Sequence, residues 1–388
     1  MDDAVRFLQE MIQIDSSNPP GNEHEIAKAL AKRCESTGIP YHITPFESNR
    51  SNLEIHLKGK GQGKLLFCGH MDTVLPGQQP WRSPPFSAQI EGEKLYGRGT
   101  SDMKSGLCAM YLAVESLFLE QKELEKDIVF LATAGEEVDS CGAREYLKDQ
   151  NLEDVEAMVI GEPTKEKVVI GHKGAFWLNI TLCGKTAHGS MPEEGINAVE
   201  WSQKVMEMIE SLKSDWNISA ASLGTSSMAV TKIDGGVQTN VIPDRCSLGI
   251  DIRSVPPQSH EQLLAKINEK LTTLLSGDGA PAFFVETELD RPSIRTDKAN
   301  PIISTALEIK ELDRDDVHGV SYYTDGAVLN PESKIPTLIY GPGDEKLAHQ
   351  PDEYVDIKSY LRSIDFYKKL AEQFSNVKEG NLSGIREK

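Results

Sequence analysis

Apolar and polar positions follow two different periods along the chain, which predicts an α/β fold. Near the N-terminus, apolar residues recur every three or four positions over residues 4–12 and 25–35, which predicts two amphipathic helices. Short apolar runs bounded by glycine or charge are typical of strands buried on both faces, and they occupy 64–69, 127–132, 155–160 and 336–340. A long helical segment at 103–121 lies between the first two of these runs. We therefore expect a mostly parallel sheet covered by helices.

The middle third of the chain has a different rhythm, in the order β-α-β-β-α-β. The predicted strands and helices are, in chain order, 176–182, 196–212, 228–233, 246–252, 261–275 and 283–289. Leu248, Ile250 and Ile252 alternate with small or polar residues, which indicates a sheet with one covered and one free face. This order predicts a ferredoxin-like α+β domain inserted into the first sheet domain. The predicted division is a catalytic domain in two parts around this insertion, 1–173, 174–290 and 291–388.

Composition and charge narrow the classes of partner. The 388 residues are 39% hydrophobic and 26% charged, which is typical of a globular chain. Because 60 acidic residues outweigh 41 basic ones, the net charge of -19 repels phosphate backbones and anionic membrane surfaces. The longest apolar run, 107–119, is too short to cross a bilayer. We expect neither nucleic acid nor a membrane as a partner.

Cysteine spacing and the first residues bear on the compartment. The chain begins with an acidic segment rather than a basic secretory leader, which predicts an unexported protein. The six cysteines form no CxxC motif, and some lie in apolar runs where a reduced thiol behaves as a small hydrophobe. A reducing cytoplasm is the expected location. The last dozen residues, 377–388, are expected to be a loose end.

Residues of metal-binding type follow the predicted strands of the first domain. Six residues are involved. Five of them follow four predicted strands, and one precedes the long helix: His70, Glu136, Glu137, Glu162, His349 and Asp102. The carboxyl ends of parallel strands share one edge of a sheet, so side chains far apart in sequence can meet there. Two imidazoles and several carboxylates suit zinc, cobalt or manganese.

Each of these residues also fits an ordinary structural role when taken alone. His70 resembles many partly buried histidines, and Asp102 would serve as the N-cap of its helix. Glu136 and Glu137 would suit the exposed first turn of a helix, and Glu162 could simply end a strand. Their joint occurrence at strand ends is what favours a metal centre.

The pair His70 and Asp72 adds an argument about orientation. Positions i and i+2 of a strand face the same way. Asp72 could therefore accept the spare imidazole proton of His70 and fix the tautomer that binds a metal.

Five segments together resemble the co-catalytic di-zinc amidohydrolase family, which includes acetylornithine deacetylase, succinyl-diaminopimelate desuccinylase, aminoacylase and a glutamate-releasing carboxypeptidase. These segments are His70–Val74, Tyr96–Lys104, Ala132–Glu137, Gly161–Thr164 and Ala348–Tyr354. The resemblance covers nearly the whole chain in the expected order. It implies a catalytic α/β domain interrupted by a lid domain that forms a homodimer.

The resemblance also implies roles for individual residues and two bound Zn²⁺ ions, with Co²⁺ or Mn²⁺ as alternatives. Zinc lowers the pKa of water and polarises an acyl oxygen, as amide hydrolysis requires. The implied assignment is His70 and Glu162 on one ion, Glu137 and His349 on the other, Asp102 bridging both, Asp72 supporting His70, and Glu136 as general base.

Four further residues match family positions that face the substrate. His188, in Gly184–Ser190, would reach the site of the neighbouring subunit and help to hold the oxyanion, although a locally packed loop histidine is the alternative. Asn240 and Arg253 are implied to bind substrate, and a guanidinium fork suits a substrate carboxylate. Arg253 would equally fit the solvated end of an exposed strand. Gly326 is implied to let the backbone approach the substrate.

The expected function is metal-dependent hydrolysis of the amide bond of N-acyl amino acids, of the succinyl-diaminopimelate desuccinylase kind, in lysine and diaminopimelate biosynthesis. Tyr323–Gly326 is similar to the desuccinylases, whereas Gly341–Gly343 followed by His349–Tyr354 is similar to acetylornithine deacetylases. A dipeptidase or carboxypeptidase acting on a short peptide stays open. Two other classes are a phosphoesterase, disfavoured because no glycine-rich phosphate loop is present, and a non-catalytic binder of amino acids or peptides.

Overall fold

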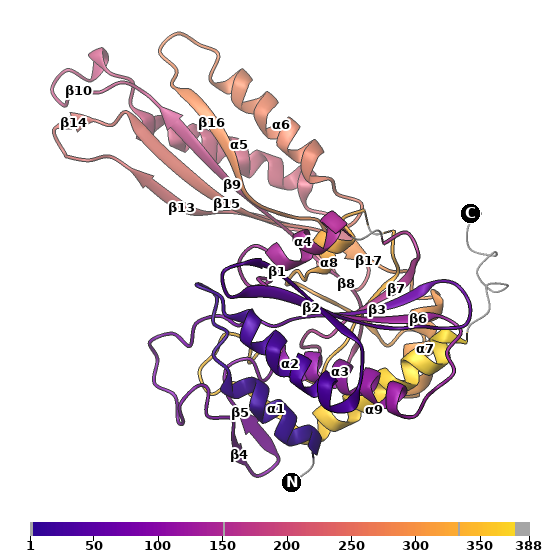
Figure 1. Cartoon of the computed structure of the whole chain (residues 1–388). Coiled ribbons are helices and arrows are strands. Elements are labelled where there is room, and N and C mark those ends of the chain that lie inside the picture. Colours follow the sequence, from indigo (N-terminus) through magenta and orange to yellow (C-terminus); the bar gives the residue numbers. More distant parts are fainter. Residues whose placement is uncertain (1–2, 150–151, 333, 377–388) are drawn as a thin grey trace. The chain divides into compact units, whose positions relative to one another are not determined.

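The computed structural model describes residues 3–149, 152–332 and 334–376 (Figure 1). The expected loose end at 377–388 lies outside these residues. The chain divides into two compact units. The first is drawn from residues 1–171, 295–318 and 324–388, and the second from 172–294 and 319–323.

The first unit is built on a mixed sheet with a parallel centre. Its strands are, in spatial order, β1 (Tyr41–Glu47), β2 (Arg50–Leu57), β6 (Asp127–Thr133), β3 (Lys64–His70), β7 (Val155–Ile160), β19 (Thr337–Ile339), β8 (Val168–His172) and β17 (Ile294–Arg295), and β18 (Val317–Val320) pairs with β8. β6, β3, β7 and β19 run parallel, while β2 and β8 flank them antiparallel. β3 and β6 are buried almost throughout, as strands covered on both faces should be. The predicted α/β class is confirmed.

Helices cover this sheet, and the most buried of them begins two residues after the candidate ligand Asp102. The helices are α1 (Asp3–Gln13), α2 (Glu23–Thr37), α3 (Lys104–Leu119), α4 (Cys141–Asp149), α7 (Pro301–Lys310), α8 (Gly326–Leu329) and α9 (Ile357–Ser375). Figure 1 shows α1, α2, α3 and α9 on the same side of the sheet. α3 is apolar on nearly every face and buries Leu107, Met110 and Val114 in the main core. An apolar helix of this kind is stable only when enclosed by other elements.

A small antiparallel sheet joins two segments that are distant in sequence. It consists of β4 (Gln89–Glu91), β5 (Lys94–Tyr96) and β20 (Tyr354–Asp356). Tyr354 of β20 pairs with Tyr96 of β5. The residues just after His349 are therefore held beside those just before Asp102.

The second unit contains a four-stranded antiparallel sheet with two helices. In chain order the elements are β9 (Gly174–Cys183), α5 (Ala198–Trp216), β13 (Ser227–Gly235), β15 (Arg245–Ser254), α6 (His260–Leu274) and β16 (Ala282–Arg291), and the strand order is β13-β15-β9-β16. α5 and α6 pack on one face through Ile209 and Ile267, against Leu178 and Ile250 of the strands. Along the chain, these six elements follow the order β-α-β-β-α-β that the sequence analysis gives. A lid or dimerisation role for this unit stays a prediction.

Short elements and one returning segment complete the second unit. The short elements are the strand pair β10 (Ala187–His188) with β14 (Val241–Ile242), the hairpin β11 (Ser219–Ala220) with β12 (Gly224–Thr225), and the turn η1 (Pro192–Glu194). The unit consists of residues 172–294 and also includes 319–323. The pattern of apolar and polar residues gave no indication that residues 319–323 belong to the second unit.

Two general features concern the whole of the described chain. Among the described residues, none of the helices combines the length and the apolar character that a membrane span requires. All six cysteines are free thiols, and four of them are buried.

Candidate metal centre

Three neighbouring parallel strands deliver ionisable side chains to one edge of the first unit's sheet. His70 is the last residue of β3, Glu136 and Glu137 follow β6 after a short turn, and Glu162 follows β7. β3 lies between β6 and β7 and is parallel to both, so the three carboxyl ends coincide. Asp102 lies just before α3, where Met103 occupies the N-cap position.

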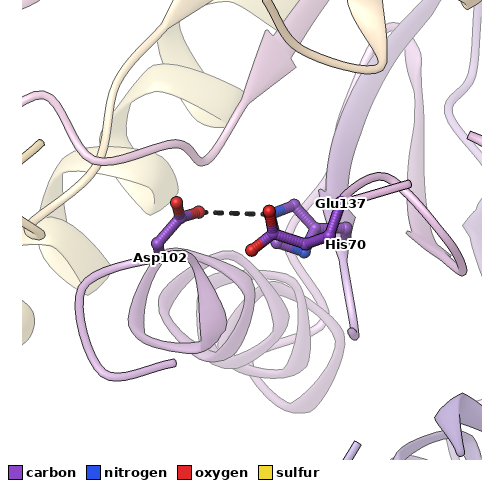
Figure 2. A group of neighbouring side chains, drawn as sticks. All are labelled: His70, Asp102 and Glu137. Carbon is purple, nitrogen blue, oxygen red and sulfur yellow. Dashed lines mark hydrogen bonds and ion pairs between the residues drawn. The ribbon is translucent and has the colours of Figure 1, made fainter. Parts of the chain in front are cut away.

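The side chains at this edge face one another across short distances. Asp102 directs Oδ1 towards His70 Nε2 at 3.2 Å and Oδ2 towards His349 Nε2 at 3.5 Å. His349 Nε2 also lies 3.0 Å from Glu137 Oε2, and His70 Nε2 lies 3.8 Å from Glu162 Oε1. Figure 2 shows Asp102 reaching the imidazole of His70 beside the carboxylate of Glu137. One carboxylate thus presents one oxygen to each of two imidazoles, which is the arrangement of a bridging ligand.

Two groups of side chains place their ligand atoms close enough to share a cation. His70, Asp102 and Glu137 form one group, and His70, Glu136 and Glu162 form the other, with the ligand atoms of each group within 4.8 Å of one another. Glu136, expected as a base, thus also lies within ligand range. The alternative roles of Asp102 as an N-cap and of Glu136 as an exposed first-turn residue do not fit, because Asp102 faces the imidazoles and Glu136 is buried.

The electrostatics of this cluster fit bound cations. Burial raises the pKa of the Glu136 and Glu162 carboxyls well above the usual value, and neighbouring carboxylates raise it further. The pKa of Glu137 is raised for the same reasons, and its buried Oε1 has no hydrogen-bond partner among the described residues. Burial opposes charge on His70, yet hydrogen bonds to Asp102 and Asp72 raise its pKa well above the usual value. A cluster with so many buried acids and two imidazoles is the donor set of a site for divalent cations.

Asp72 holds the turn that carries the two glutamates. Its Oδ1 accepts hydrogen bonds from the backbone N–H groups of Gly135 and Glu136, and its Oδ2 accepts one from Glu137 N–H, at 3.0–3.2 Å. His70 Nδ1 lies 2.9 Å from the backbone oxygen of Asp72 and 3.5 Å from Oδ1. The carbonyl oxygen of Asp72 is thus the nearer acceptor for the Nδ1 proton of His70, and the carboxylate of Asp72 is the more distant one. This leaves His70 Nε2 free to face Asp102.

Two acidic residues at this site were not singled out in the sequence. Asp325 is buried and accepts a hydrogen bond from Thr133 Oγ1 at 2.6 Å, and its charge contributes to the raised pKa of Glu136 and Glu162. Glu353 is fully buried against the loop that carries Asp102. Both lie in segments that the sequence analysis quotes for other residues, Gly326 and His349. An isolated acidic residue in a loop is usually exposed to solvent, so the sequence gave no reason to expect that these two are buried.

The substrate-facing residues expected from the resemblance belong mainly to the second unit. His188 is exposed in β10 and bonds to Ser190 Oγ through Nδ1 at 2.8 Å. Asn240 lies beside it, because its carbonyl accepts the Gly189 N–H at 2.8 Å. Arg253 makes a two-pronged contact with Asp251, at 2.8 and 3.0 Å.

Gly326, in the first unit, begins α8, and its N–H bonds to Thr324 Oγ1. The substrate roles of Gly326, His188, Asn240 and Arg253 stay predictions.

The comparison with known proteins identifies the family. Residues 66–373 match peptidase family M20/M25/M40. The chain belongs to this family. This M20 chain is therefore a hydrolase of the metallopeptidase and amidohydrolase type, and the recognition from its motifs is confirmed.

Individual M20 relatives resemble this chain over nearly its whole length. A protein of Staphylococcus aureus named a probable succinyl-diaminopimelate desuccinylase is 30% identical over 408 residues, covering 96% of this chain and 97% of that protein. An acetylornithine deacetylase of Aliivibrio fischeri is 30% identical over 360 residues, covering 92% and 93%. A solved structure of a dinuclear metal-binding M20 peptidase from Bacillus subtilis superposes with a TM-score of 0.72 at 16% identity, covering 96% and 97%.

Proposed function

We propose that this M20 hydrolase cleaves the amide bond of N-acyl amino acids and that its substrate is of the N-succinyl-diaminopimelate kind. The observation that carries the hydrolytic part is the Asp102 carboxylate, which faces His70 and His349 with one oxygen each. The substrate part is supported by the Staphylococcus aureus relative, which matches 96% of the chain.

We further propose that the centre holds two divalent cations, zinc first among them. His70 and Glu162 would hold one, Glu137 and His349 would hold the other, and Asp102 would be shared by both, in keeping with the short distances among these side chains. Bound zinc activates water and polarises the acyl oxygen. The positive charge also keeps the buried glutamates ionised against the cost of burial.

In this proposal Glu136 is the general base. It takes a proton from the attacking water and passes it to the departing amine nitrogen. Its position next to Glu137, on a turn fixed by three N–H bonds to Asp72, keeps its carboxylate at the cluster. Burial raises the pKa of the Glu136 carboxyl, so this carboxylate holds a proton more firmly than an exposed one does.

The second unit is proposed to be a lid that dimerises. Asn240 and Arg253 bind the substrate there, and the partner subunit's His188 helps to hold the oxyanion. Arg253 donates Nε and Nη2 to Asp251, so a substrate carboxylate would have to approach the other edge of the guanidinium, formed by Nη1 and the second Nη2 hydrogen. The charge of -19 and six free thiols agree with a cytoplasmic enzyme.

A second candidate substrate is N-acetylornithine, favoured by the relative from Aliivibrio fischeri at equal identity. The test is an amine-release assay on N-succinyl-diaminopimelate, N-acetylornithine, several N-acyl amino acids and dipeptides. The expected result is the highest kcat/KM for the succinyl substrate, loss of all activity on chelation and its return with Zn²⁺. A tenfold preference for N-acetylornithine would replace the proposed substrate. Activity untouched by chelation would overturn the metal mechanism.

A further inference from the structure

We propose that Glu353 is a positioning residue of the metal centre, whose carboxylate holds the loop that carries Asp102 in register with the segment that carries His349. This inference rests on the ligand roles proposed above. We do not assign Glu353 as a metal ligand, because both of its carboxylate oxygens accept hydrogen bonds from an arginine side chain and three backbone N–H groups.

The contacts of Glu353 are unusually complete for a buried acid. Its Oε1 accepts the backbone N–H groups of Ser101 at 2.7 Å and of Asp102 at 3.0 Å. Its Oε2 accepts the N–H of Gly99 at 3.1 Å and Arg98 Nη1 at 2.6 Å. The side chain is 0% exposed. Four donors therefore converge on one carboxylate, three of them from the backbone of the Asp102 loop.

The loop needs such an acceptor because the N–H groups of Gly99, Ser101 and Asp102 precede α3 and lie outside its hydrogen-bond ladder. α3 begins at Lys104, and Met103 at its N-cap makes no capping hydrogen bond. Gly99 has a left-handed φ of 86°, which turns successive N–H groups inward. A buried N–H that loses its acceptor costs about 1–3 kcal/mol. Without the Glu353 carboxylate, the loop would gain by moving its N–H groups towards water, and Asp102 would move with it.

The same residue fixes the other side of the centre. Glu353 follows His349 by four positions, and its carbonyl accepts the N–H of Gly97 at 2.9 Å. Arg98 Nη1 also bonds to the carbonyl of Gln350 at 3.3 Å. These contacts bind the His349 segment to the Asp102 loop, whose side chains lie 3.5 Å apart at His349 Nε2 and Asp102 Oδ2.

A simpler explanation is that Glu353 only neutralises Arg98. The two explanations can be distinguished, because Arg98 contacts Oε2 of Glu353, whereas the N–H groups of Ser101 and Asp102 contact its Oε1. Both predict a less stable Glu353→Gln protein. Only the positioning role predicts weaker metal binding by protein that is still folded.

The test is Zn²⁺ titration of metal-free full-length protein by calorimetry, together with the visible absorption of the Co²⁺-loaded protein. Glu353→Gln is compared with wild type and with the matched control Glu115→Gln. Glu115, in the C-terminal half of α3, is another buried glutamate, and its carboxylate accepts two hydrogen bonds from Arg33 of α2. Residues that orient metal ligands typically cost about 10–100-fold in affinity when changed. We expect that loss and an altered Co²⁺ spectrum for Glu353→Gln, and wild-type values for Glu115→Gln.

Two further variants keep the test decisive if Glu353→Gln does not fold. Arg98→Met retains the carboxylate and its three backbone donors and loses only the guanidinium contacts to Glu353 and to the Gln350 carbonyl, so its affinity for Zn²⁺ should fall clearly less than that of Glu353→Gln. The double variant Arg98→Met/Glu353→Gln leaves no unpaired buried guanidinium, and it should lose about 10–100-fold.

Wild-type affinity in the double variant, or an equal loss in Arg98→Met, overturns the positioning role. Absence of hydrolysis by metal-loaded wild type would instead overturn the proposed function and leave these affinities interpretable.

Discussion

The side-chain amide of Asn18 donates a hydrogen bond to the carboxylate of Asp72, with Nδ2 2.9 Å from Oδ2. Both side chains are buried, and 54 positions separate them in the sequence. The same carboxylate also accepts hydrogen bonds from the N–H groups of the turn that carries Glu136 and Glu137. The N-terminal segment thus helps to orient the carboxylate on which the proposed base depends.

Replacement of this amide should disturb the turn without removing any proposed ligand. For Asn18→Ala we expect a loss of about 1–3 kcal/mol in the free energy of unfolding, since a buried carboxylate oxygen loses a donor. We also expect kcat to fall more than KM changes. Urea denaturation and steady-state kinetics measure these effects. Asn22→Ala is the control, because Asn22 makes an exposed bond to the carbonyl of Asp15. Equal effects of the two substitutions would contradict the prediction.

The role of Glu136 can be separated from metal binding. Glu136→Gln should lower kcat by roughly 10²–10⁴-fold, because the amide cannot accept the proton. Metal analysis of the dialysed protein should still give two equivalents. Glu145→Gln on the nearby α4 should leave both quantities unchanged, since its carboxylate pairs only with Lys148 among the contacts described. Loss of one equivalent in Glu136→Gln would identify Glu136 as a ligand instead.

The close contact between α3 and the segment before Glu162 provides a steric test. A Cβ added at Gly106 would lie 1.8 Å from the carbonyl oxygen of Gly161. Alanine ordinarily favours a helix over glycine by about 1 kcal/mol, but overpacking here should cost about 1–3 kcal/mol. Gly106→Ala should therefore lower the melting temperature and weaken Zn²⁺ binding. Gly277→Ala, where a Cβ meets nothing within 4 Å, is the control. A more stable Gly106→Ala protein would show that the backbones are farther apart.

Stability in acid should depend on His172 at the end of β8. Burial lowers the pKa of His172 from 6.5 to about 4. Because the folded-state pKa lies below the unfolded-state value, unfolding takes up a proton in this window. The contribution of the neutral imidazole is thus complete above pH 6.5, and about 3 kcal/mol of stability is lost as the pH falls towards 4. His172→Leu should flatten the dependence of unfolding free energy on pH between these values, and an unchanged slope would refute the assignment.

Much of the fold could be predicted from the sequence, because apolar and polar residues alternate with a regular period in most of its strands and helices. β3, β6 and β7 are short apolar runs buried on both faces, and β15 alternates strictly between buried and partly exposed positions. The antiparallel strands β1, β2 and β8 and the small sheet of β4, β5 and β20 were not anticipated. β1 and β2 mix polar and apolar positions, and β8 and the strands of the small sheet have five residues or fewer.

The candidate ligands and Asp72 were singled out in the sequence, but the buried acids Glu353 and Asp325 were not. His70, Glu137 and Glu162 stand out because polar residues directly follow apolar strands. Glu353 and Asp325 lie in loops, where an acid in the sequence gives no sign of being buried. Asp72 was expected to orient His70 with its carboxylate, whereas the carbonyl is the nearer acceptor and the carboxylate holds the turn. Hydrogen bonds between distant backbone segments leave no periodic trace in the sequence.

The α/β class, the two kinds of sheet and the acidic and imidazole side chains available to a metal follow from the amino-acid sequence, because local periodicity and residue chemistry are properties of neighbouring positions. The position of Asp102 between His70 and His349, and the hydrogen bonds of the Asp102 loop to Glu353, follow from the folded chain. Those relationships arise when the chain closes on itself over long separations and each buried polar group must find a partner.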